Sequence, residues 1–324
     1  MAVDAGTVGV AIVGPGRMGE AHAAAWSALA PDAQVLAVVG GRTPRALAHA
    51  PGARATTDLD AVLADPAVHV VSICTPTDTH LDLTRRALEA GKHVLLEKPV
   101  ARTATEGERV VELARGGPGL VMVAQVVRFF PGFLAVRALV EEGALGALRE
   151  VRAERLAPGG GRPAWLDDEA RSGGFLVDLA VHDFDQLLLL LGPARRVHAT
   201  AGPDGTAEVV VEHAGGGVGR VRAGWDLPPE RPFRTLLEVT GERGRAQYAA
   251  AGGEGELVVD RDGASARTVL GDGEPYTAQA RAFLACVRSG AAPVDGDPAA
   301  SLAALRLAEA ARDALAGGAP VDLA

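Results

Sequence analysis

A strand-like run, a glycine-rich turn and a helix-like run follow one another in VGVAIVGPGRMGEAHAAAWSAL, and this combination constrains the fold more than any other feature. Gly14, Gly16 and Gly19 form the pattern G-x-G-x-x-G directly after the strand residues Val8 to Val13. The first glycine permits a tight turn, the second lets the backbone approach a pyrophosphate, and the third allows the helix to pack closely on the strand. The helix N-terminus then stabilises the negative charge. This context predicts a dinucleotide-binding Rossmann unit, to which a purely structural glycine turn is the alternative.

The second expected strand, QVLAVVGG, ends in glycine and not in an acidic residue. An acid at this place bonds the adenosine ribose 2′-hydroxyl in NAD-binding units. Here Gly40 and Gly41 are followed by Arg42, whose planar guanidinium can pair with a 2′-phosphate in bidentate fashion. We therefore expect NADP(H) to be favoured. If Arg42 is only a solvated loop residue, NAD(H) binds as well.

Strand-like and helix-like segments alternate through the first third of the chain. Val68–Cys74 and KHVLLEKPV have the pattern of buried strands, and a helix is expected to begin at His80. Such alternation predicts a right-handed, doubly wound parallel sheet. Thr75-Pro76-Thr77 and Glu97-Lys98-Pro99 then lie at the carboxyl ends of strands, where open α/β sheets bind their ligands. The residues expected to bind the cofactor are Gly14, Gly16, Arg17, Met18, Gly19, Gly41, Arg42, Thr43, Arg45, Thr75, Pro76, Thr77, His80, Glu97 and Lys98.

Composition argues against several classes of partner. The 324 residues suffice for about two domains, and 48% of them are hydrophobic, enough to build substantial cores. A net charge of −9 without a long basic run argues against nucleic acid or an anionic membrane, and no apolar run is long enough to span a bilayer. The start lacks a basic signal-peptide region, and two cysteines, Cys74 and Cys286, make no disulfide framework. We expect a cytoplasmic protein.

The pattern changes after about Val123. Strand-like runs separated by glycine-rich turns follow: LREVRAERL, GTAEVVVEH, GVGRVRAGWD and FRTLLEVTGE. We therefore expect a Rossmann domain over residues 1–123 and a domain for substrate binding and oligomerisation over residues 124–324. The closing helices, about residues 276–316, could pack back on the first domain.

An apolar stretch with charged residues set into it, GGFLVDLAVHDFDQLLLLLG, spans residues 173–192. If the stretch is one helix, Asp178, His182 and Asp185 stand at i, i+4 and i+7 and form one narrow stripe. Asp183 points away from that stripe. The stripe is either the solvated side of an amphipathic helix or part of a functional site.

Four stretches, GPGRMG, ICTPTDTH, EKP and GGFLVDLAVHDFD, occur in that order, and a closing segment begins at YTAQARAFLACVRSG. In these stretches the chain resembles, nearly end to end, the glucose–fructose oxidoreductase and inositol dehydrogenase (Gfo/Idh/MocA) family of nicotinamide-dependent sugar and polyol oxidoreductases. The resemblance implies a Rossmann domain followed by an α/β domain built on a large, mostly antiparallel, open sheet. It also implies a homodimer or homotetramer associated through the exposed face of that sheet. A cis peptide bond at Lys98-Pro99 would fit the family as well.

By this resemblance, Lys98 of EKP and the Asp-x-x-x-His pair Asp178 and His182 match the family's catalytic positions, with the polar stripe facing the nicotinamide. Removing hydride from a CH–OH carbon requires a base for the hydroxyl proton, and histidine titrates near neutral pH. Asp178 can orient the imidazole and stabilise its protonated form, while Lys98 can hydrogen-bond the reacting oxygen. The same groups in reversed roles give carbonyl reduction.

Each of these roles has a structural alternative. Lys98 could be a surface lysine before a turn proline, and His182 could be a satisfied core histidine. Asp183 and Asp185 are expected to be structural, bonding the backbone or a neighbouring arginine. Asp178 and His182 could hold a metal, but no third ligand has suitable spacing, so we expect none.

The candidate substrate contacts lie in three further stretches. In VAQVVRFFPGF, Gln125 and Arg128 loosely match a polar residue and an arginine that the family often carries at the start of its second domain. Trp165, in GRPAWLDDEARSGG, lies in a loop able to cover the cofactor, where its ring could stack on a sugar or simply pack. Arg155 and Trp225 are weaker candidates. The residues expected to bind substrate are Gln125, Arg128, Arg155, Trp165, Asp178 and His182.

The sequence thus predicts an NADP(H)-preferring oxidoreductase acting on a secondary alcohol or carbonyl of a sugar or polyol, such as an inositol or a pyranose. A reductase of a non-sugar carbonyl or C=N bond is the alternative among enzymes, since the fold tolerates many substrates. A catalytically silent, NAD(P)-sensing regulator is the alternative from another class. The intact set of Lys98, Asp178 and His182 counts against that regulator.

Overall fold

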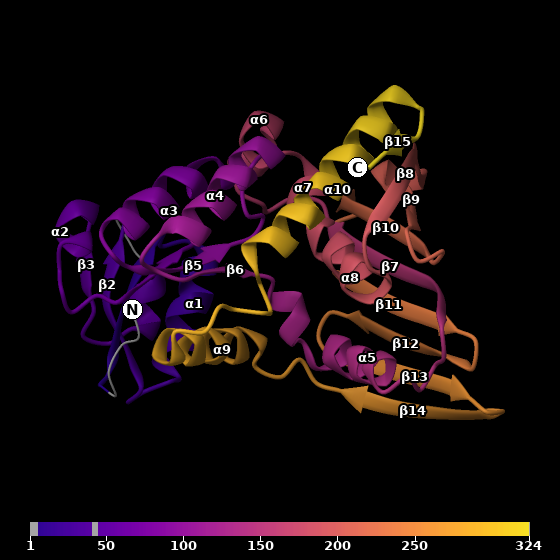
Figure 1. Cartoon of the computed structure of the whole chain (residues 1–324), viewed down its shortest axis with the longest axis horizontal. Helices are drawn as coiled ribbons and strands as arrows, with labels where there is room; N and C mark the ends of the chain where they lie inside the picture. Colours follow the sequence, from indigo (N-terminus) through magenta and orange to yellow (C-terminus); the bar gives the residue numbers. More distant parts are fainter. Residues whose placement is uncertain (1–5, 41–44, 324) are drawn as a thin grey trace. The chain divides into compact units, whose positions relative to one another are not determined.

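The structure is a computed structural model that describes residues 6–40 and 45–323. Its contacts define two compact units (Figure 1). The first comprises Met1–Val126 and Glu274–Leu302, and the second comprises Val127–Gly273 and Ala303–Ala324. Within the described ranges, no helix combines the length and apolar composition that crossing a membrane requires.

A six-stranded parallel sheet with the order β3-β2-β1-β4-β5-β6 forms the centre of the first unit. The strands are β1 (Val8–Val13), β2 (Ala33–Val39), β3 (Arg54–Thr56), β4 (Val70–Ile73), β5 (His93–Glu97) and β6 (Val121–Ala124). β1, β4, β5 and β6 are buried along their whole length, as expected of a sheet covered on both faces. The strand order reverses at β1, which places the glycine turn at the switch point where such sheets bind ligands. The predicted doubly wound parallel sheet is confirmed.

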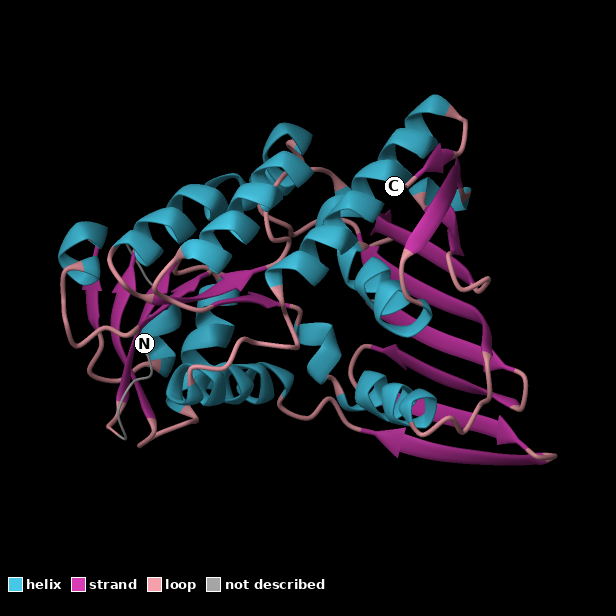
Figure 2. Ribbon diagram, viewed as in Figure 1, coloured by secondary structure: helices cyan, strands magenta, loops and turns pink. Residues whose placement is uncertain are grey.

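Helices cover both faces of this sheet (Figures 1 and 2). The helices of the first unit are α1 (Arg17–Ser27), η1 (Arg45–His49), α2 (Leu59–Leu63), η2 (Thr77–Thr79), α3 (His80–Glu89), α4 (Ala104–Gly116) and α9 (Pro275–Ser289). α1 and α9 lie on one face, and α3 and α4 lie on the other. Although α9 comes from the end of the sequence, it belongs to the first unit, where Arg288 forms an ion pair of 2.7 Å with Asp32.

A nine-stranded sheet with the order β14-β13-β12-β11-β7-β10-β9-β8-β15 forms the centre of the second unit. The strands are β7 (Leu148–Pro158), β8 (Ala194–Ala201), β9 (Ala207–His213), β10 (Val218–Leu227), β11 (Arg234–Gly241), β12 (Gly244–Ala251), β13 (Gly255–Arg261), β14 (Ala264–Leu270) and β15 (Val321–Asp322). Neighbouring strands are antiparallel, except that β7 and β10 are parallel. The expected mostly antiparallel sheet is confirmed, and the strand-like runs correspond to β7, β9, β10 and β11.

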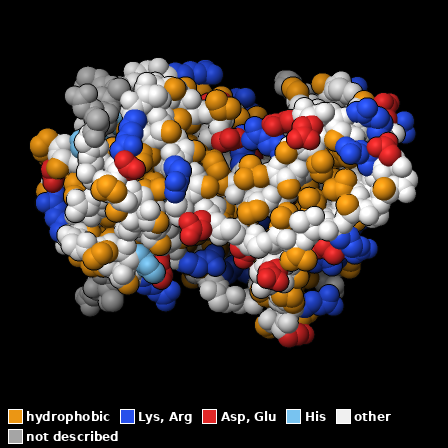
Figure 3. Space-filling model, turned by 90° about the horizontal axis from the view of Figure 1, so that it is seen from below, with side chains coloured by type: hydrophobic (Ala, Val, Ile, Leu, Met, Phe, Trp, Pro, Cys, Tyr) orange, Lys and Arg blue, Asp and Glu red, His pale blue; other side chains and the backbone are white. Residues whose placement is uncertain are grey.

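The two faces of this sheet differ in what they carry. The remaining helices are η3 (Val126–Phe129), α5 (Pro131–Glu141), η4 (Ala164–Leu166), α6 (Glu169–Ser172), α7 (Phe175–Asp178), α8 (Val181–Leu191), η5 (Pro203–Gly205) and α10 (Pro298–Gly317). On one face α8 packs against β7 and β10, and α5 packs against β12, where the rings of Phe133 and Tyr248 meet edge-on with centroids 5.8 Å apart. The other face carries cross-strand ion pairs such as Arg245 with Asp260, at 2.8 Å. Figure 3 views the molecule from below, and there basic and acidic side chains are interspersed among hydrophobic ones.

The stretch of residues 173–192, whose polar stripe was described for the case of one helix, contains two consecutive helices. α7 ends at Asp178 and α8 begins at Val181, because the backbone hydrogen bonding changes at Ala180. The N–H of Ala180 reaches back to the Phe175 carbonyl, and the Ala180 carbonyl then accepts the first hydrogen bonds of α8. Asp178 is therefore the last residue of one short helix, and His182 lies in the first turn of the next.

Candidate active site

The three glycines after β1 differ in what a side chain at each position would meet. Gly14 has a φ of +98°, and a Cβ added there would lie 2.6 Å from the carbonyl oxygen of Cys74 on the neighbouring strand segment. A Cβ on Gly19 would collide with the carbonyl of Gly14. Gly16 faces open space, with no heavy atom within 4 Å of its added Cβ, and no side chain caps the N-terminus of α1 that follows it. The turn therefore offers space and backbone N–H groups to a phosphate.

The adenosine end of the predicted cofactor site lies partly outside the described residues. Gly41, Arg42 and Thr43 fall in the gap between residues 40 and 45, so the expected contact with a 2′-phosphate stays a prediction. Arg45 opens η1 and is exposed. Arg17 is likewise exposed in the first turn of α1, where its charge complements that of a phosphate.

The carboxyl end of β4 leads into the segment Thr75–Thr79. The hydroxyls of Thr75 and Thr79 are 2.6 Å apart. Thr77, which lies between these two residues in the sequence, is buried. His80 is also buried, and its Nδ1 and Nε2 lie 2.9 Å and 3.1 Å from the carbonyl oxygens of Pro99 and Thr75. The His80 ring thus connects the segment that follows β4 with the segment that follows β5. This contact makes His80 a support for the expected cofactor-facing backbone.

The end of β5 is held by a histidine that the sequence reasoning missed. His22 of α1 lies with Nε2 2.8 Å from Glu97 Oε1 and Nδ1 2.7 Å from the Ser72 hydroxyl. The second carboxylate oxygen of Glu97 accepts the backbone N–H of Lys98 at 3.1 Å. The next peptide bond, Lys98-Pro99, is cis, as the resemblance implied. Glu97 was expected to bind the cofactor. Its two carboxylate oxygens are hydrogen-bonded to His22 and to the backbone N–H of Lys98.

The charges of this pair reinforce each other. Burial by itself would lower the pKa of His22, but the neighbouring Cys74 and the Glu97 carboxylate raise it to about 10. Burial would likewise raise the pKa of Glu97, yet the hydrogen bond and charge of His22, together with Lys98 and His80, hold that pKa below its usual range. These directions favour a buried imidazolium–carboxylate pair at this site.

Lysine is rare in this chain, which makes Lys98 informative. The sequence has 32 lysine and arginine residues in total, and Lys92 and Lys98 are the only lysines. Lys92 is buried and donates to the carbonyl of Asp65 at 2.9 Å, a structural use. Lysine supplies a compact charge and an amine that can titrate, neither of which arginine offers. Lys98 directly follows β5, at the sheet edge where the cofactor is expected, and there it supplies a group that the chain's arginines cannot replace.

Gln125 and Lys98 directly follow neighbouring strands at the same sheet edge. Glu97 of β5 and Ala124 of β6 form the last pair of the parallel register before these two residues. The Gln125 side chain is 1% exposed, and neither its Oε1 nor its Nε2 has a hydrogen-bond partner among the described residues. Leaving a buried polar group unpaired costs about 1–3 kcal/mol. The Gln125 amide is therefore a hydrogen-bonding group that a ligand at this edge could satisfy.

In the second unit, two arginines form ion pairs with aspartates of α8, the helix that carries His182. Arg155 of β7 donates from Nε and Nη2 to Asp183, at 2.9 Å and 3.0 Å. Arg128 of η3 donates from the same two nitrogens to Asp185, at 2.7 Å for each bond. All four side chains are buried, and the expectation that these aspartates bond a neighbouring arginine is confirmed. Arg128 and Arg155, predicted as substrate contacts, hold the first turns of α8 through these bonds.

A cavity of about 220 Å³ lies next to Arg155 within the second unit. Its walls include the rings of Phe130, Phe133, Phe233 and Tyr248, and the Arg155 guanidinium lies 6.0 Å from the Phe233 ring centroid. The buried hydroxyl of Thr235 lines it without a hydrogen-bond partner among the described residues. Sequence reasoning missed this cavity because β11, β12 and the segment before α5 assemble it from distant parts of the chain.

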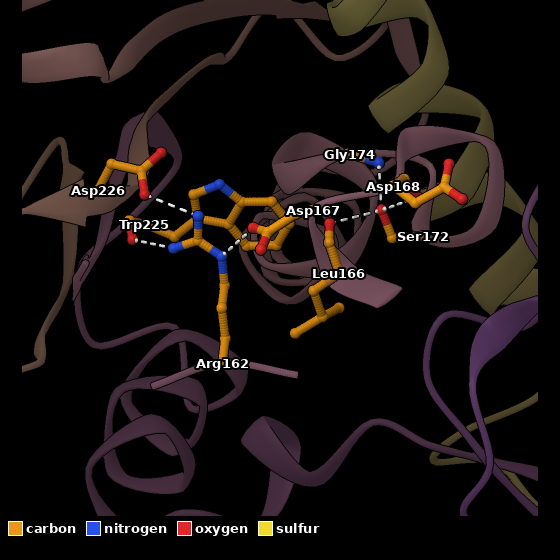
Figure 4. Close-up of polar contacts among 8 residues, drawn as sticks. All are labelled: Arg162, Leu166, Asp167, Asp168, Ser172, Gly174, Trp225 and Asp226. Atoms are coloured by element: carbon orange, nitrogen blue, oxygen red, sulfur yellow. Dashed lines mark hydrogen bonds and ion pairs between the residues drawn. The ribbon is translucent and has the colours of Figure 1, made fainter. Parts of the chain in front are cut away.

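The loop that carries Trp165 is anchored to the end of β10. Arg162 donates to Asp167, to Asp226 and to the carbonyl of Trp225, each at 2.8 Å (Figure 4). Its guanidinium lies 4.7 Å from the Trp225 ring centroid. Trp165 itself lies in η4 and is half-buried. Trp225, a weaker substrate candidate, therefore serves as the platform on which Arg162 fixes this loop.

Asp178 and His182 follow this loop directly. At its end Ser172 donates to the carbonyl of Leu166 at 3.0 Å and accepts the N–H of Gly174 at 3.1 Å (Figure 4). Asp178 is half-buried, whereas His182 is 8% exposed. The described part of the chain contains no group of three or more His, Cys, Asp and Glu residues that could hold a metal ion.

Two family models match most of the chain. Residues 8–125 match the oxidoreductase family with an NAD-binding Rossmann fold, which makes the chain a nicotinamide-dependent oxidoreductase. Residues 133–247 match the GFO/IDH/MocA C-terminal domain. The chain belongs to the Gfo/Idh/MocA family of oxidoreductases, and the resemblance drawn from its motifs is confirmed.

Several relatives are similar over long stretches. Inositol 2-dehydrogenase of Rhizobium meliloti (strain 1021) is 31% identical over 329 residues, which cover 94% of this chain and 96% of that protein. A scyllo-inositol 2-dehydrogenase (NADP(+)) of Bacillus subtilis (strain 168) is 30% identical over 197 residues, or 60% of this chain and 54% of that protein. A solved levoglucosan dehydrogenase, in complex with NADH and L-sorbose, superposes with a TM-score of 0.86 over 98% of this chain and 99% of that one. At 22% identity, that likeness shows the shared fold.

Proposed function

We propose that the protein transfers hydride between a nicotinamide cofactor and a secondary alcohol or carbonyl of a sugar or polyol, with Lys98, Asp178 and His182 as its catalytic residues. The observation that carries the proposal is the position of Lys98, one of only two lysines, at the carboxyl edge of the Rossmann sheet. The relatives named above act on inositols and levoglucosan, which supports the substrate class.

The first unit fits a dinucleotide. The open space at Gly16 and the uncapped N-terminus of α1 suit the pyrophosphate, and the exposed Arg17 lies in the same helical turn. We propose a preference for NADP(H), because glycine and Arg42 follow β2 where an acid would bond the ribose hydroxyl. A bound oxidised nicotinamide would supply the hydride acceptor for the alcohol carbon.

The chain's own residues manage the proton and the charge on oxygen. During oxidation His182 takes the hydroxyl proton, and during reduction it returns that proton. Asp178 orients the imidazole and stabilises its protonated form, while the Lys98 ammonium hydrogen-bonds the reacting oxygen and offsets its negative charge. The bonds of Asp183 and Asp185 to Arg155 and Arg128 keep the first turns of α8 in place for this exchange.

The cavity beside Arg155 supports a neutral, hydroxylated substrate. Aromatic rings provide apolar faces against which the C–H bonds of a sugar or cyclitol can pack. The Thr235 hydroxyl supplies a hydrogen bond that the described residues leave unmade. Of its two charged lining residues, Arg155 is already paired with Asp183, and Asp272 is the other. Such a lining favours hydroxyl groups over phosphate or carboxylate groups.

We further propose that copies associate as a dimer or tetramer through the sheet face opposite α5 and α8, and that the protein works in the cytoplasm. The ion pairs on that face supply polar, directional contacts for a symmetric interface. The two cysteines are free, which is consistent with a reducing compartment. Sedimentation analysis of the wild type and of Arg220→Glu would test the interface, since the variant places like charges around Glu150.

The direct test of the proposed function is turnover. Purified protein is incubated with a panel of inositols, aldoses and anhydrosugars, with NADP⁺ or NAD⁺, and reduced nicotinamide is followed by its absorbance. Turnover of any cyclic polyol or sugar supports the proposal and reveals the cofactor preference. Silence across the panel, with tight binding of NADPH, contradicts the proposed substrate class.

A further inference from the structure

A buried polar row connects three elements of the first unit behind the end of β5. It runs from the Ser72 hydroxyl on β4 through His22 on α1 to Glu97 on β5, and it ends at the backbone N–H of Lys98. Ser72, His22 and Glu97 are 0%, 2% and 5% exposed. None of these three side chains has a contact that the proposed chemistry uses directly. A row this buried needs a structural or functional reason, because polar groups are costly to remove from water.

The row is anchored so that Glu97 has little freedom. Its Oε1 is bonded by the ring of His22 and its Oε2 by the Lys98 N–H, so both carboxylate oxygens are occupied. The ring of Tyr276 on α9 lies near the ring of His22, tilted against it, with centroids 6.3 Å apart. On the far side of Lys98, His80 lies 2.9 Å from the Pro99 carbonyl. The backbone is therefore restrained on both sides of the Lys98 side chain. His22 restrains the Lys98 N–H through Glu97, and His80 restrains the Pro99 carbonyl directly.

Charge gives His22 a role beyond geometry. Glu97 is a buried carboxylate, and both His22 and Lys98 stabilise its charged form. A buried charge that loses one partner must protonate, move or draw in another cation. Without His22, the cation directly following Glu97 in the chain is the ammonium of Lys98. That ammonium would then be drawn toward Glu97 and away from a substrate oxygen.

We propose that His22 is a positioning residue for Lys98: its pairing with Glu97 balances that carboxylate, so that Glu97 holds the Lys98 backbone while the lysine amine serves the substrate. The inference rests on the proposed catalytic role of Lys98. It assigns a task to a histidine of α1 that bonds Ser72 and Glu97 and takes no part in the proposed proton transfer. The inference also gives a reason for the hydrogen bond between His22 of α1 and Glu97 of the Glu-Lys-Pro stretch.

The test compares His22→Ala, Glu97→Gln and the double variant with the wild type. His198→Gln, at an exposed position on β8, is the control. We expect His22→Ala to lower kcat by about tenfold or more, the effect of one charged hydrogen bond, with unchanged affinity for NADPH. Adding Glu97→Gln should recover part of the lost kcat, because the unbalanced carboxylate is gone. A purely structural role for His22 predicts no such recovery.

A second readout does not depend on turnover. The two lysines are acylated by an amine-reactive ester, and mass spectrometry measures the extent of acylation at each. The acylation rate of Lys98 is then compared with that of Lys92 in the same sample. In His22→Ala, we expect slower acylation of Lys98 relative to Lys92, and in the double variant a return toward the wild-type ratio. If the wild type turns over no sugar or polyol, the proposed function fails, and this ratio still decides the inference.

The inference is overturned if His22→Ala keeps wild-type kcat and acylation, or if Glu97→Gln adds its own loss to that of His22→Ala. Thermal unfolding shows whether each variant is folded. If His22→Ala does not fold, His22→Gln replaces it, because the amide can still donate to Glu97 but carries no charge. The same recovery by Glu97→Gln is then required.

Discussion

Arg155 of β7 and Asp183 of α8 form a bidentate pair, with bonds of 2.9 Å and 3.0 Å, and both side chains are buried. The pair fastens the residue next to His182 to the central strand of the second unit's sheet. Burial raises the pKa of Asp183, and Arg155 opposes that effect. A carboxylate in such surroundings depends on its partner to remain charged. The pair therefore links the sheet to the position of the proposed base.

Removing one partner of this pair should be costly. We expect Arg155→Leu to lower the free energy of unfolding by about 3–5 kcal/mol, because Asp183 is left buried and unpaired. Adding Asp183→Leu should recover most of the loss. Arg267→Ala breaks an exposed pair with Glu256 and should cost no more than about 1 kcal/mol. Urea unfolding followed by circular dichroism measures all four proteins, and equal losses for Arg155→Leu and Arg267→Ala would contradict the role of burial.

The glycine turn gives a prediction that separates binding from folding. Gly16→Ala should fold with wild-type stability, because its Cβ meets nothing, but should weaken NADPH binding by about tenfold or more by obstructing the phosphate. Gly116→Ala, also in open space but at the end of α4, is the matched control and should bind normally. Fluorescence titration with NADPH measures the affinities. Normal binding by Gly16→Ala would place the pyrophosphate elsewhere.

Cofactor preference depends on Arg42 in this account. Arg42→Ala should lower the affinity for NADPH by about tenfold or more, since a bidentate charged contact is lost, and leave the affinity for NADH nearly unchanged. Titration of both reduced cofactors into wild type and variant gives the ratio directly. An unchanged ratio would show that GGRTPR does not contact the 2′-phosphate.

His22 should make stability depend on pH at the alkaline side. Its pKa is raised in the folded state to about 10, above the value of 6.5 for the free side chain. Its contribution is therefore fully present below pH 6.5 and is lost as the pH rises toward 10. The wild type should lose stability over this interval more steeply than His22→Gln, by at most about 1.4 kcal/mol per pH unit. Unfolding in urea across that range measures the difference, and parallel curves would show that His22 is not charged.

Local patterns allowed much of the first unit to be predicted. β1 and its glycine turn are contiguous, and β4 and β5 are buried runs followed by residues that were expected to bind the cofactor. The break at Ala180 was not predictable from periodicity, because the apolar positions continue through it. β14 was missed because its side chains are almost all exposed and show no alternation.

Long-range contacts account for most of what the sequence did not reveal at the site. His22 meets Ser72 and Glu97, which lie 50 and 75 residues further along the chain. Nothing near His22 in the sequence marks it as more than a buried helical residue. Arg128 and Arg155 were recognised as special, but their partners on α8 show that they hold the helix. The sequence thus identified the residue types, and only the fold showed which of them are paired.

The central claim is that Lys98 acts on the reacting oxygen, and replacing it by arginine tests this most directly. Lys98→Arg keeps the charge but changes the shape and titration of the group, while Lys92→Arg is the matched change at the other lysine. Steady-state oxidation of a sugar or polyol that the wild type accepts is followed by nicotinamide absorbance. We expect kcat of Lys98→Arg to fall by about a hundredfold or more, with unchanged NADPH affinity, and Lys92→Arg to stay active. Near-normal kcat in Lys98→Arg would contradict the assignment of Lys98 as a catalytic residue.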